Sequence, residues 1–325
     1  MTPLVASLRR LGLIGDDIPP MRPLGGGVSS EVWRVELPSG PVCVKRALPR
    51  LNVAAHWEAP VERSRYEAAW LDIANAIVPG TGPEVLAYEE GGALVLTYLD
   101  PDTYPVWKDR LRDGHAHLCV AAEVGRRLGR VHAATAGRAD VAARFDNAEL
   151  FGVMRLEPYL GAVARVHPDL APALASLRIS FADNAGALIH GDASPKNILA
   201  GPDGPVFLDS ECATWGDPAF DVGFCASHLL LKCRWNPAAT ARLLACYDAL
   251  LDGHRAAYGA DAALTGRIAR WVAACLLARV DGLSPVEYLD AAGRASTRAV
   301  ARRLVADPAA GVGEIRAAWA RSLRN

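Results

Sequence analysis

The spacing of apolar residues changes once along the chain, near residue 98, and this change sets the architecture. Between Leu24 and Tyr98 the apolar residues form short alternating runs that Gly and Pro interrupt, as in antiparallel strands. After Pro105 the chain is rich in alanine and its apolar residues keep a helical spacing. We therefore expect an α+β protein with two domains, a small antiparallel-sheet domain over 1–97 and a mainly helical domain over 98–325.

Two hairpins and one helix are predicted in the first domain. Residues 32–37 alternate, stop at a Pro-Ser-Gly turn and are followed by the apolar run 42–45, which indicates a hairpin. Residues 83–88 and 93–98, joined by Glu-Glu-Gly-Gly, indicate a second one. Residues 61–78 keep a helical spacing between flanking prolines, so we expect a helix packed on the sheet.

The second domain is predicted to be helical with one interruption. Short apolar runs over 187–189, 198–200 and 206–208 indicate strands, the first of which leads into His190 and the others into Asp209. Polar and acidic residues at strand ends inside a helical domain point to a site. The helices are expected over 117–134, 147–165, 168–182, 217–231, 236–257, 261–280 and 284–306.

Composition excludes several classes of protein. The 325 residues include 35 Lys and Arg against 36 Asp and Glu, so the charge gives no reason to expect nucleic-acid binding. No apolar run approaches the roughly 20 residues that span a bilayer. The seven cysteines form no C-x-x-C pair, and Arg9 and Arg10 follow the first apolar residues, the reverse of a signal peptide. We expect a cytoplasmic protein whose cysteines are mostly small core residues.

The segment His190-Gly191-Asp192-Ala-Ser-Pro-Lys-Asn197 holds the strongest chemical signal. An aspartate at the tip of a loop can accept a proton from an attacking hydroxyl or orient that hydroxyl. An asparagine five residues later and an aspartate just after a strand, here Asp209, offer oxygen ligands to a hard cation such as Mg²⁺. Phosphoryl transfer needs these parts, because its catalysis is mostly positioning and charge neutralisation.

These motifs, H-G-D-x-x-x-x-N, a hydrophobic run ending in Asp, and G-D-P-x-x-D, resemble the aminoglycoside phosphotransferase and choline kinase family. The resemblance covers about residues 20–300 and implies a two-lobed, protein-kinase-like fold. It implies that Asp192 is the catalytic base or the residue that orients the acceptor hydroxyl, and that Asn197 and Asp209 bind Mg²⁺. Asp217 and Asp221 would be structural, Asp217 as the cap of a helix that begins at Pro218. His190 is expected to hold the loop by hydrogen bonds.

The first lobe has the order of parts that a kinase small lobe requires, which is a glycine-rich turn, a strand, Lys45 and a helix with Glu67. We therefore expect the ATP site there. Glycines let the backbone approach phosphates closely, and backbone N–H groups and a serine hydroxyl can donate to their oxygens. Lys45 would hold the α- and β-phosphates, with Glu67 orienting it and Glu62 as the alternative. The remaining ATP-binding candidates are the glycine-rich turn, with Gly25, Gly26, Gly27 and Ser29, and the interlobe hinge, with Leu96 and Tyr98.

A narrower resemblance points to methylthioribose kinases. It rests on the K-x-A-L-P run that begins at Lys45, on Trp57 and on the D-x-E motif that ends at Glu211. It implies Glu211 as a second acidic metal contact, with a plain loop carboxylate as the alternative. Asn197 and the shorter chain depart from that subfamily, so the resemblance indicates kinship rather than the same substrate.

The sequence leaves the acceptor open. We expect an ATP- and Mg²⁺-dependent kinase of a small-molecule hydroxyl, with a sugar-like acceptor first. An aminoglycoside or choline-like amino alcohol is the alternative, and a non-catalytic pseudokinase is the alternative of another class. Interleaved arginines disfavour a polycationic acceptor, and an aromatic content of 7% gives no sign of an ammonium cage. Lys232 with Arg234 could meet an anionic substrate, with a solvated helix end as the alternative, and the tryptophans could stack on a sugar or fill the core. The acceptor candidates are the neighbourhood of Asp217, Trp215, His228, Lys232, Trp235, Arg279 and Asp281. ATP-versus-GTP preference and oligomeric state stay open.

Overall fold

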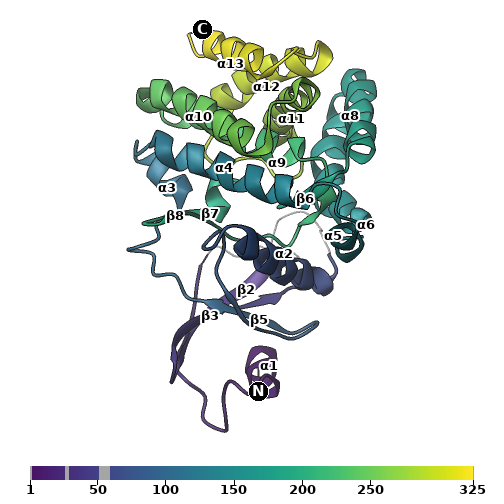
Figure 1. Ribbon diagram of the computed structural model, residues 1–325. Helices are drawn as coiled ribbons and strands as arrows, with labels where there is room; N and C mark the ends of the chain where they lie inside the picture. Colours follow the sequence, from purple (N-terminus) through teal and green to yellow (C-terminus); the bar gives the residue numbers. More distant parts are fainter. Residues whose placement is uncertain (1, 26–28, 51–58, 325) are drawn as a thin grey trace.

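A small antiparallel sheet lies on one side of a larger helical lobe (Figure 1). The structure is a computed structural model and describes residues 2–25, 29–50 and 59–324. The sheet has five strands in the order β1-β2-β3-β5-β4. Both predicted hairpins are present, as the antiparallel pairs β2–β3 and β4–β5. The strands are β1 (Met21–Pro23), β2 (Ser30–Leu37), β3 (Gly40–Ala47), β4 (Val85–Tyr88) and β5 (Ala93–Thr97).

Two helices cover opposite faces of this sheet. Helix α2 (Ser64–Ile77) follows a 3₁₀ turn (Val61–Arg63), as predicted, and packs with Leu94 and Leu96 of β5. Helix α1 (Pro3–Arg10), which the sequence analysis missed, covers the other face. Because side chains alternate along a strand, neighbouring residues of β5 enter two different clusters. Helix α1 meets Val35, Val42, Val44 and Val95 through Leu4 and Leu8.

Helix forms in every predicted helical region of the second lobe, with one boundary wrong. The last helix was expected from residue 284, but α12 begins at Ala291 with Asp290 capping the Gly293 N–H. The preceding segment is irregular because Arg279 binds the carbonyl and hydroxyl of Ser284. Helices α3, α5 and α13 were not predicted.

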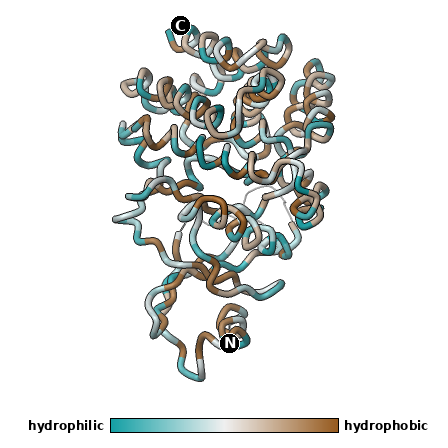
Figure 2. The backbone as a smooth tube through the Cα atoms, viewed as in Figure 1, coloured by the Kyte–Doolittle hydropathy of each residue, from teal (hydrophilic) through white to brown (hydrophobic). Residues whose placement is uncertain are grey.

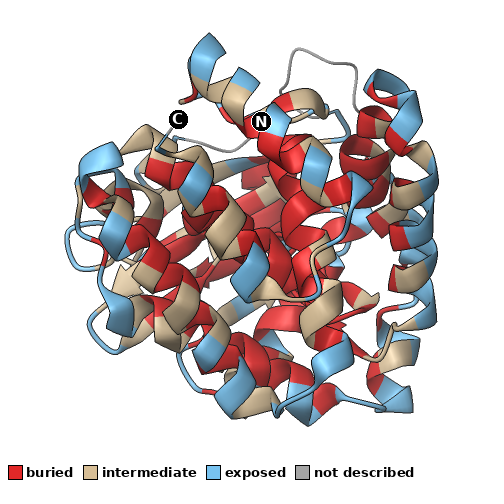
Figure 3. Ribbon diagram, turned by 90° about the horizontal axis from the view of Figure 1, so that it is seen from above, coloured by how far each residue is buried: buried red, intermediate tan, exposed pale blue. Residues whose placement is uncertain are grey.

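The helices of this lobe are α3 (Trp107–Arg112), α4 (Leu118–Thr135), α5 (Ala139–Arg144), α6 (Ala148–Phe151), a π-helix (Gly152–Gly161), α7 (Ala162–Val166), α8 (Ala171–Asp183), α9 (Ala219–Trp235), α10 (Thr240–Tyr258), α11 (Ala262–Asp281), α12 (Ala291–Ala306) and α13 (Val312–Ser322). Short 3₁₀ turns occupy Pro168–Leu170, Pro195–Asn197 and Pro237–Ala239. Hydrophobic and hydrophilic residues alternate along the outer helices (Figure 2), whereas α9 and α11 are buried along most of their length. Figure 3 shows buried residues gathered in the interior of the molecule and exposed ones at its edge.

Short strands form in the predicted segment 187–210, where Figure 1 labels β6, β7 and β8, and a further strand, β9, was not predicted. Strand β6 (Ala187–Ile189) pairs with β9 (Thr214–Gly216), and β7 (Ile198–Gly201) pairs with β8 (Gly204–Phe207). The loops that follow β6 and β8 carry the predicted catalytic residues.

The structure bears on the expectations about cysteines and about membrane-spanning segments. All seven cysteines are free thiols and five of them are buried, as expected of small core residues, while Cys119 is exposed. Within the described residues, no helix has both the length and the apolar character needed to cross a bilayer.

Candidate active site

The loop after β6 is fixed by hydrogen bonds from its own backbone. The Asp221 carboxylate, at the start of α9, accepts the N–H groups of His190 (2.7 Å) and Gly191 (2.9 Å). Gly191 has φ 76°, and a Cβ there would lie 2.2 Å from the carbonyl oxygen of Cys212. Only glycine fits that position without moving the neighbouring backbone.

His190 holds the loop, as expected. Its Nδ1 accepts the N–H of Asp192 at 3.1 Å, and its ring meets the edge of Trp70 on α2 with the ring centroids 4.8 Å apart. Burial lowers the pKa of His190, so the neutral ring that can accept this bond is favoured.

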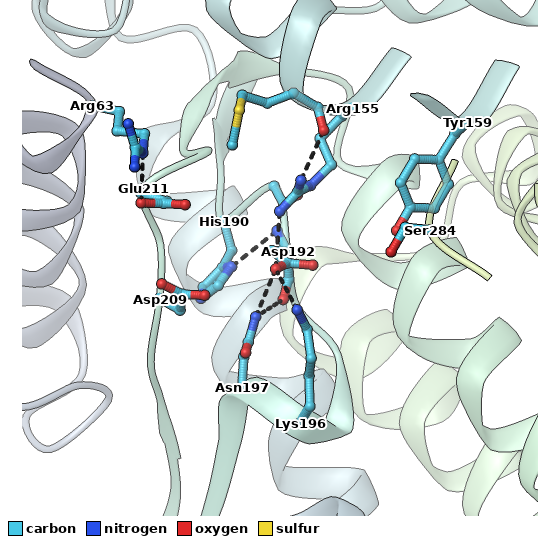
Figure 4. A network of polar contacts seen from close by, with 12 residues as sticks. Arg63, Arg155, Tyr159, His190, Asp192, Lys196, Asn197, Asp209, Glu211 and Ser284 are labelled. Carbon is cyan, nitrogen blue, oxygen red and sulfur yellow. Dashed lines mark hydrogen bonds and ion pairs between the residues drawn. The ribbon is translucent and has the colours of Figure 1, made fainter. Parts of the chain in front are cut away.

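Asp192 lies at the centre of a buried polar network (Figure 4). The Asn197 side-chain nitrogen donates to Asp192 Oδ2 at 2.7 Å, and Nη2 of Arg155 lies 2.9 Å from the same oxygen. The Lys196 ammonium is 3.4 Å away. The structure thus brings the predicted pair Asp192 and Asn197 together and adds two cations, which hold the carboxylate in one orientation.

Arg155 is a site residue that sequence reasoning missed. It comes from the π-helix, is 7% exposed and also donates to the Gly191 carbonyl at 2.7 Å. Burial opposes its charge, but the Asp192 carboxylate outweighs that effect and raises the pKa of Arg155. Its only sequence signal is an arginine inside an apolar helical run, Val-Met-Arg-Leu, which on its own indicates no partner.

Lys45 connects the sheet to the loop after β8. Its ammonium donates to both oxygens of Glu67 (2.7 and 2.8 Å) and to Oδ1 of Asp209 (2.8 Å). Glu62, the alternative partner, is exposed. Burial works against the charge of Lys45, but Asp209 and Glu67 outweigh it and raise the pKa of the lysine. Burial raises the pKa of Glu67.

The backbone of Asp209 is strained. Its φ is 63°, and it is the one non-glycine residue with positive φ in the described part of the chain. Such a conformation costs of the order of 1–3 kcal/mol and persists where surrounding contacts enforce it, often at functional sites. Burial acts to raise the pKa of Asp209, but Lys45 and Lys196 outweigh it and lower that pKa.

Glu211 is engaged by an arginine that the sequence did not single out. The fully buried Arg63 donates from Nε to Glu211 at 2.9 Å and from its other nitrogens to the carbonyls of Ala59, Pro60, Ser29 and Leu48. This contact gives Glu211 a partner other than a metal. Its predicted metal role stays a prediction.

The remaining ATP-binding candidates take different places. Ser29 is buried at the start of β2, Gly25 lies in the turn before it, and Gly26 and Gly27 fall outside the described residues. The Leu96 side chain belongs to the core, and Tyr98 follows β5 with the Arg34 guanidinium 4.5 Å from its ring centroid. The adenine-binding role of this hinge stays a prediction.

The side chains near Asp192 fit a hard cation. Because the Asn197 nitrogen faces Asp192, its carbonyl oxygen is turned away from that carboxylate, and the Asp209 carboxylate adds two more oxygens. Among the described residues, no three His, Cys, Asp or Glu side chains form a ready metal cluster. Such a site suits Mg²⁺, which is commonly held by one or two protein groups together with substrate phosphates.

Four of the acceptor candidates lie near one another. His228, Lys232 and Trp235 lie on one face of α9, and Arg279 lies at the end of α11. Two other candidates do not join them. Asp281 is paired with His167 (2.7 Å) and Arg298, and Trp215 sits in β9 opposite Leu188 and packs on the core.

Asp217 and Asp221 have the structural contacts expected of them. Asp217 accepts the N–H of Ala219, in the first turn of α9, and pairs with Arg267 at 2.8 Å. Asp221 binds the loop backbone and lies 3.2 Å from His132. Both carboxylates are fully buried and have polar partners.

The sheet-and-helix architecture with this site defines a protein-kinase-like fold. The chain belongs to the family described as APH, phosphotransferase enzyme family, whose sequence model matches residues 20–264. The resemblance drawn from the catalytic motifs is therefore confirmed.

Curated relatives are methylthioribose kinases. Methylthioribose kinase 1 of Oryza sativa subsp. japonica is 26% identical over 240 residues, which cover 65% of this chain and 56% of that protein. Methylthioribose kinase of Yersinia pseudotuberculosis is 27% identical over 238 residues, covering 64% and 58%. The chain thus spans a little over half the length of these relatives.

Solved structures share the fold at low identity. A choline/ethanolamine kinase family protein from Mesorhizobium loti has a TM-score of 0.51 at 18% identity, covering 99% of each chain. An amicoumacin kinase in complex with AMP-PNP, Ca²⁺ and Ami has a TM-score of 0.55 at 15% identity, covering 93% of each chain.

Proposed function

We propose that this protein transfers the γ-phosphoryl group of ATP to a hydroxyl group of a small molecule. The observation that carries this proposal is the buried Asp192, whose carboxylate is held by Asn197 and Arg155. The ion pair between Lys45 and Asp209 joins the sheet to the loop after β8 in the same site. Family membership supports the same reaction class. The sheet lobe, residues 1–97, would bind the nucleotide, and residues 98–325 would supply the catalytic loop and the acceptor site.

In the proposed reaction each of a few side chains has one role. The Asp192 carboxylate orients the acceptor hydroxyl and takes its proton, a bond forms between that oxygen and the γ-phosphorus, and the bond to the β–γ bridging oxygen breaks to release ADP. Lys45, aligned by Glu67, would hold the α- and β-phosphates. When bound through Asn197 and Asp209, Mg²⁺ supplies neutralisation of phosphate charge.

For the acceptor we propose a sugar-like hydroxyl compound. The methylthioribose kinase relatives support this choice. An ammonium-bearing acceptor is disfavoured because the protein's own Lys232 lies against the rings of Trp235 (4.8 Å) and Tyr288 (4.7 Å), where an external ammonium would bind. Aminoglycosides and amino alcohols are therefore the second choice.

The test is release of ADP from ATP and Mg²⁺ with methylthioribose, other sugars, aminoglycosides and amino alcohols. We expect a sugar to stimulate ADP formation, and Asp192→Asn to lower the stimulated rate by at least about 10³-fold while nucleotide binding is retained. Asp203→Asn, an exposed aspartate in the β7–β8 turn, is the matched control and should keep full activity. Full activity of Asp192→Asn would contradict the mechanism. If ATP binds but no acceptor stimulates ADP formation, the hypothesis of a non-catalytic pseudokinase is favoured.

A further inference from the structure

The acceptor side of Asp192 contains buried cations that lack carboxylate partners. Lys232 is 1% exposed, and its ammonium contacts only the aromatic faces of Trp235 and Tyr288, with neither a hydrogen bond nor an ion pair to any described residue. The two rings are stacked with their centroids 4.3 Å apart, which fixes the lysine between α9 and the segment before α12. A buried ammonium without a counter-ion is costly for folding.

Arg279 is the second such cation. Its guanidinium donates to the Tyr159 hydroxyl (3.1 Å) and to the Ser284 carbonyl and hydroxyl, which are neutral acceptors. Its Nε is buried and has no hydrogen-bond partner in the described structure. The side chain is 8% exposed. Arg279 is therefore a buried charge whose Nε–H has no hydrogen-bond acceptor among the described residues.

These cations lie beyond Asp192 as seen from the nucleotide side. Figure 4 shows Asp192 between Asp209 on one side and Tyr159 and Ser284, the partners of Arg279, on the other. Asp192 is close enough to add to the pKa of Arg279. Burial, together with Arg279, Lys232, Lys196 and Lys108, lowers the pKa of His228 well below its usual value. Arg279 therefore lies on the side of Asp192 that Tyr159 and Ser284 occupy, and Lys232 is held by Trp235 of α9 and by Tyr288, four residues after Ser284.

The carboxylates nearby do not neutralise these cations. Asp192 is already paired with Arg155 and Lys196, Glu287 is paired with Lys108 and largely exposed, and Asp109 is paired with Arg112 and half-exposed. A ligand that brings its own negative charge would supply the missing partner. A neutral sugar would leave both buried cations uncompensated.

We infer that the phosphate acceptor is itself an anion, a hydroxyl compound whose carboxylate or phosphate group binds Lys232 and Arg279 while its hydroxyl faces Asp192. The inference rests on the proposed function and narrows the sugar-like acceptor to a sugar acid or a sugar phosphate. The stacked pair Trp235 and Tyr288 would hold the lysine and flank the anionic group.

The first experiment measures binding without nucleotide. Calorimetric titration of the full chain uses D-ribose 5-phosphate, D-ribonate, D-ribose and methylthioribose. We expect one of the two anions to bind at least about 100-fold more tightly than both neutral sugars, since a buried charge pair is worth that much or more. The better anion identifies phosphate or carboxylate as the recognised group. Equal affinities for anions and neutral sugars would overturn the inference.

The second experiment assigns the effect to Lys232. Lys232→Met should weaken binding of the preferred anion on the order of 100-fold and leave the KM for ATP unchanged, and Lys232→Arg should restore much of the affinity. Arg234→Met is the matched control, because Arg234 lies two residues away but turns to Trp319 and Ser322 on α13. An increase in the KM for ATP with unchanged anion binding would assign the cation to nucleotide phosphates and overturn the inference.

The outcomes separate this inference from the proposed function. Lys232-dependent anion binding with no ADP formation for any acceptor supports the anion site and contradicts the kinase. ADP formation with neutral sugars alone supports the kinase and contradicts the anionic acceptor.

Discussion

The Asp221 carboxylate accepts the backbone N–H of His190 at 2.7 Å, across 31 residues of chain. The same carboxylate accepts the Gly191 N–H and faces His132. The first turn of α9 thereby fixes the loop that carries Asp192, and the position of the Asp192 carboxylate depends on a residue with which it has no hydrogen bond or ion pair among the described residues.

Asp221→Asn should lower both stability and activity. The amide keeps one acceptor oxygen and places an N–H group against a backbone donor, so one buried N–H loses its partner. We expect the free energy of unfolding to fall by about 2–4 kcal/mol, measured by urea denaturation. Asp72→Asn is the control, because Asp72 is largely exposed and its only ion pair with a described residue, Arg144, is 3.8 Å long. A change below about 0.5 kcal/mol in Asp221→Asn would show that the loop does not need the carboxylate.

Glu67→Gln should impair nucleotide use more than folding. The amide still accepts one bond from Lys45 but no longer neutralises its charge, so the ammonium is drawn toward Asp209. We expect the KM for ATP to rise about 10-fold or more in steady-state kinetics. Glu62→Gln alters an exposed acid close by and should leave the KM unchanged. Equal effects of the two substitutions would contradict the assignment of Glu67.

Glu211→Gln distinguishes a metal ligand from a partner of Arg63. Loss of the buried ion pair at 2.9 Å should lower the free energy of unfolding by about 1–3 kcal/mol in urea denaturation. The Mg²⁺ concentration for half-maximal activity should change less than twofold. An increase of about tenfold or more in that concentration, with unchanged stability, would instead make Glu211 a metal ligand.

Lys232→Met should stabilise the protein in a pH-dependent way. Burial and the nearby Lys108 lower the pKa of Lys232 to about 7, so the folded state disfavours the protonated lysine that the unfolded chain retains up to about pH 10. Stability of the wild-type protein should therefore rise between pH 7 and 10, and the variant should lack this rise. We expect a gain of about 2 kcal/mol at pH 6 in thermal or urea unfolding, shrinking toward pH 10. A loss of stability at pH 6 would show that the lysine is well solvated.

Anion binding should weaken as pH rises. Lys232, with a pKa lowered to about 7 by burial, loses its proton above that pH, whereas a sugar carboxylate stays ionised. The other charged groups that face it are Lys108, Arg279, Glu287 and Asp109. We expect the calorimetric affinity for D-ribonate to fall about 10-fold between pH 6 and 8.5, and the profile of Lys232→Met to be flat. Parallel profiles in the two proteins would assign the titration to another group.

The order of secondary structure and the catalytic loop could be predicted because their signals are local. Alternation over 32–37 and the Pro-Ser-Gly turn determine a hairpin within a few residues, and H-G-D-x-x-x-x-N places Asp192 and Asn197 on one loop. Helix α12 was placed seven residues too early, since Arg279, near the end of α11 and five positions before Ser284, binds that serine and holds the segment out of the helix.

Residues whose roles depend on distant partners could not be predicted. Arg155 lies 37 positions before Asp192, and Arg63 lies 148 positions before Glu211. In the sequence each is a single arginine in or before a helix, a context in which most arginines are solvated. The sequence likewise favours Lys232 as a solvated charge at a helix end. Its burial depends on the packing of Tyr288 against Trp235, which the sequence does not indicate.

The contact between Trp70 and His190 joins the two lobes through one core. Trp70 is fully buried, belongs to a helix of the sheet lobe, and packs on the catalytic loop and on Phe207. A fragment that begins after the sheet would expose this surface, so the helical lobe is not an autonomous module. Exchange of sheet lobes between members of the family would have to carry α2 and the loop it contacts together, which ties the inheritance of the proposed ATP site to that of the loop with Asp192.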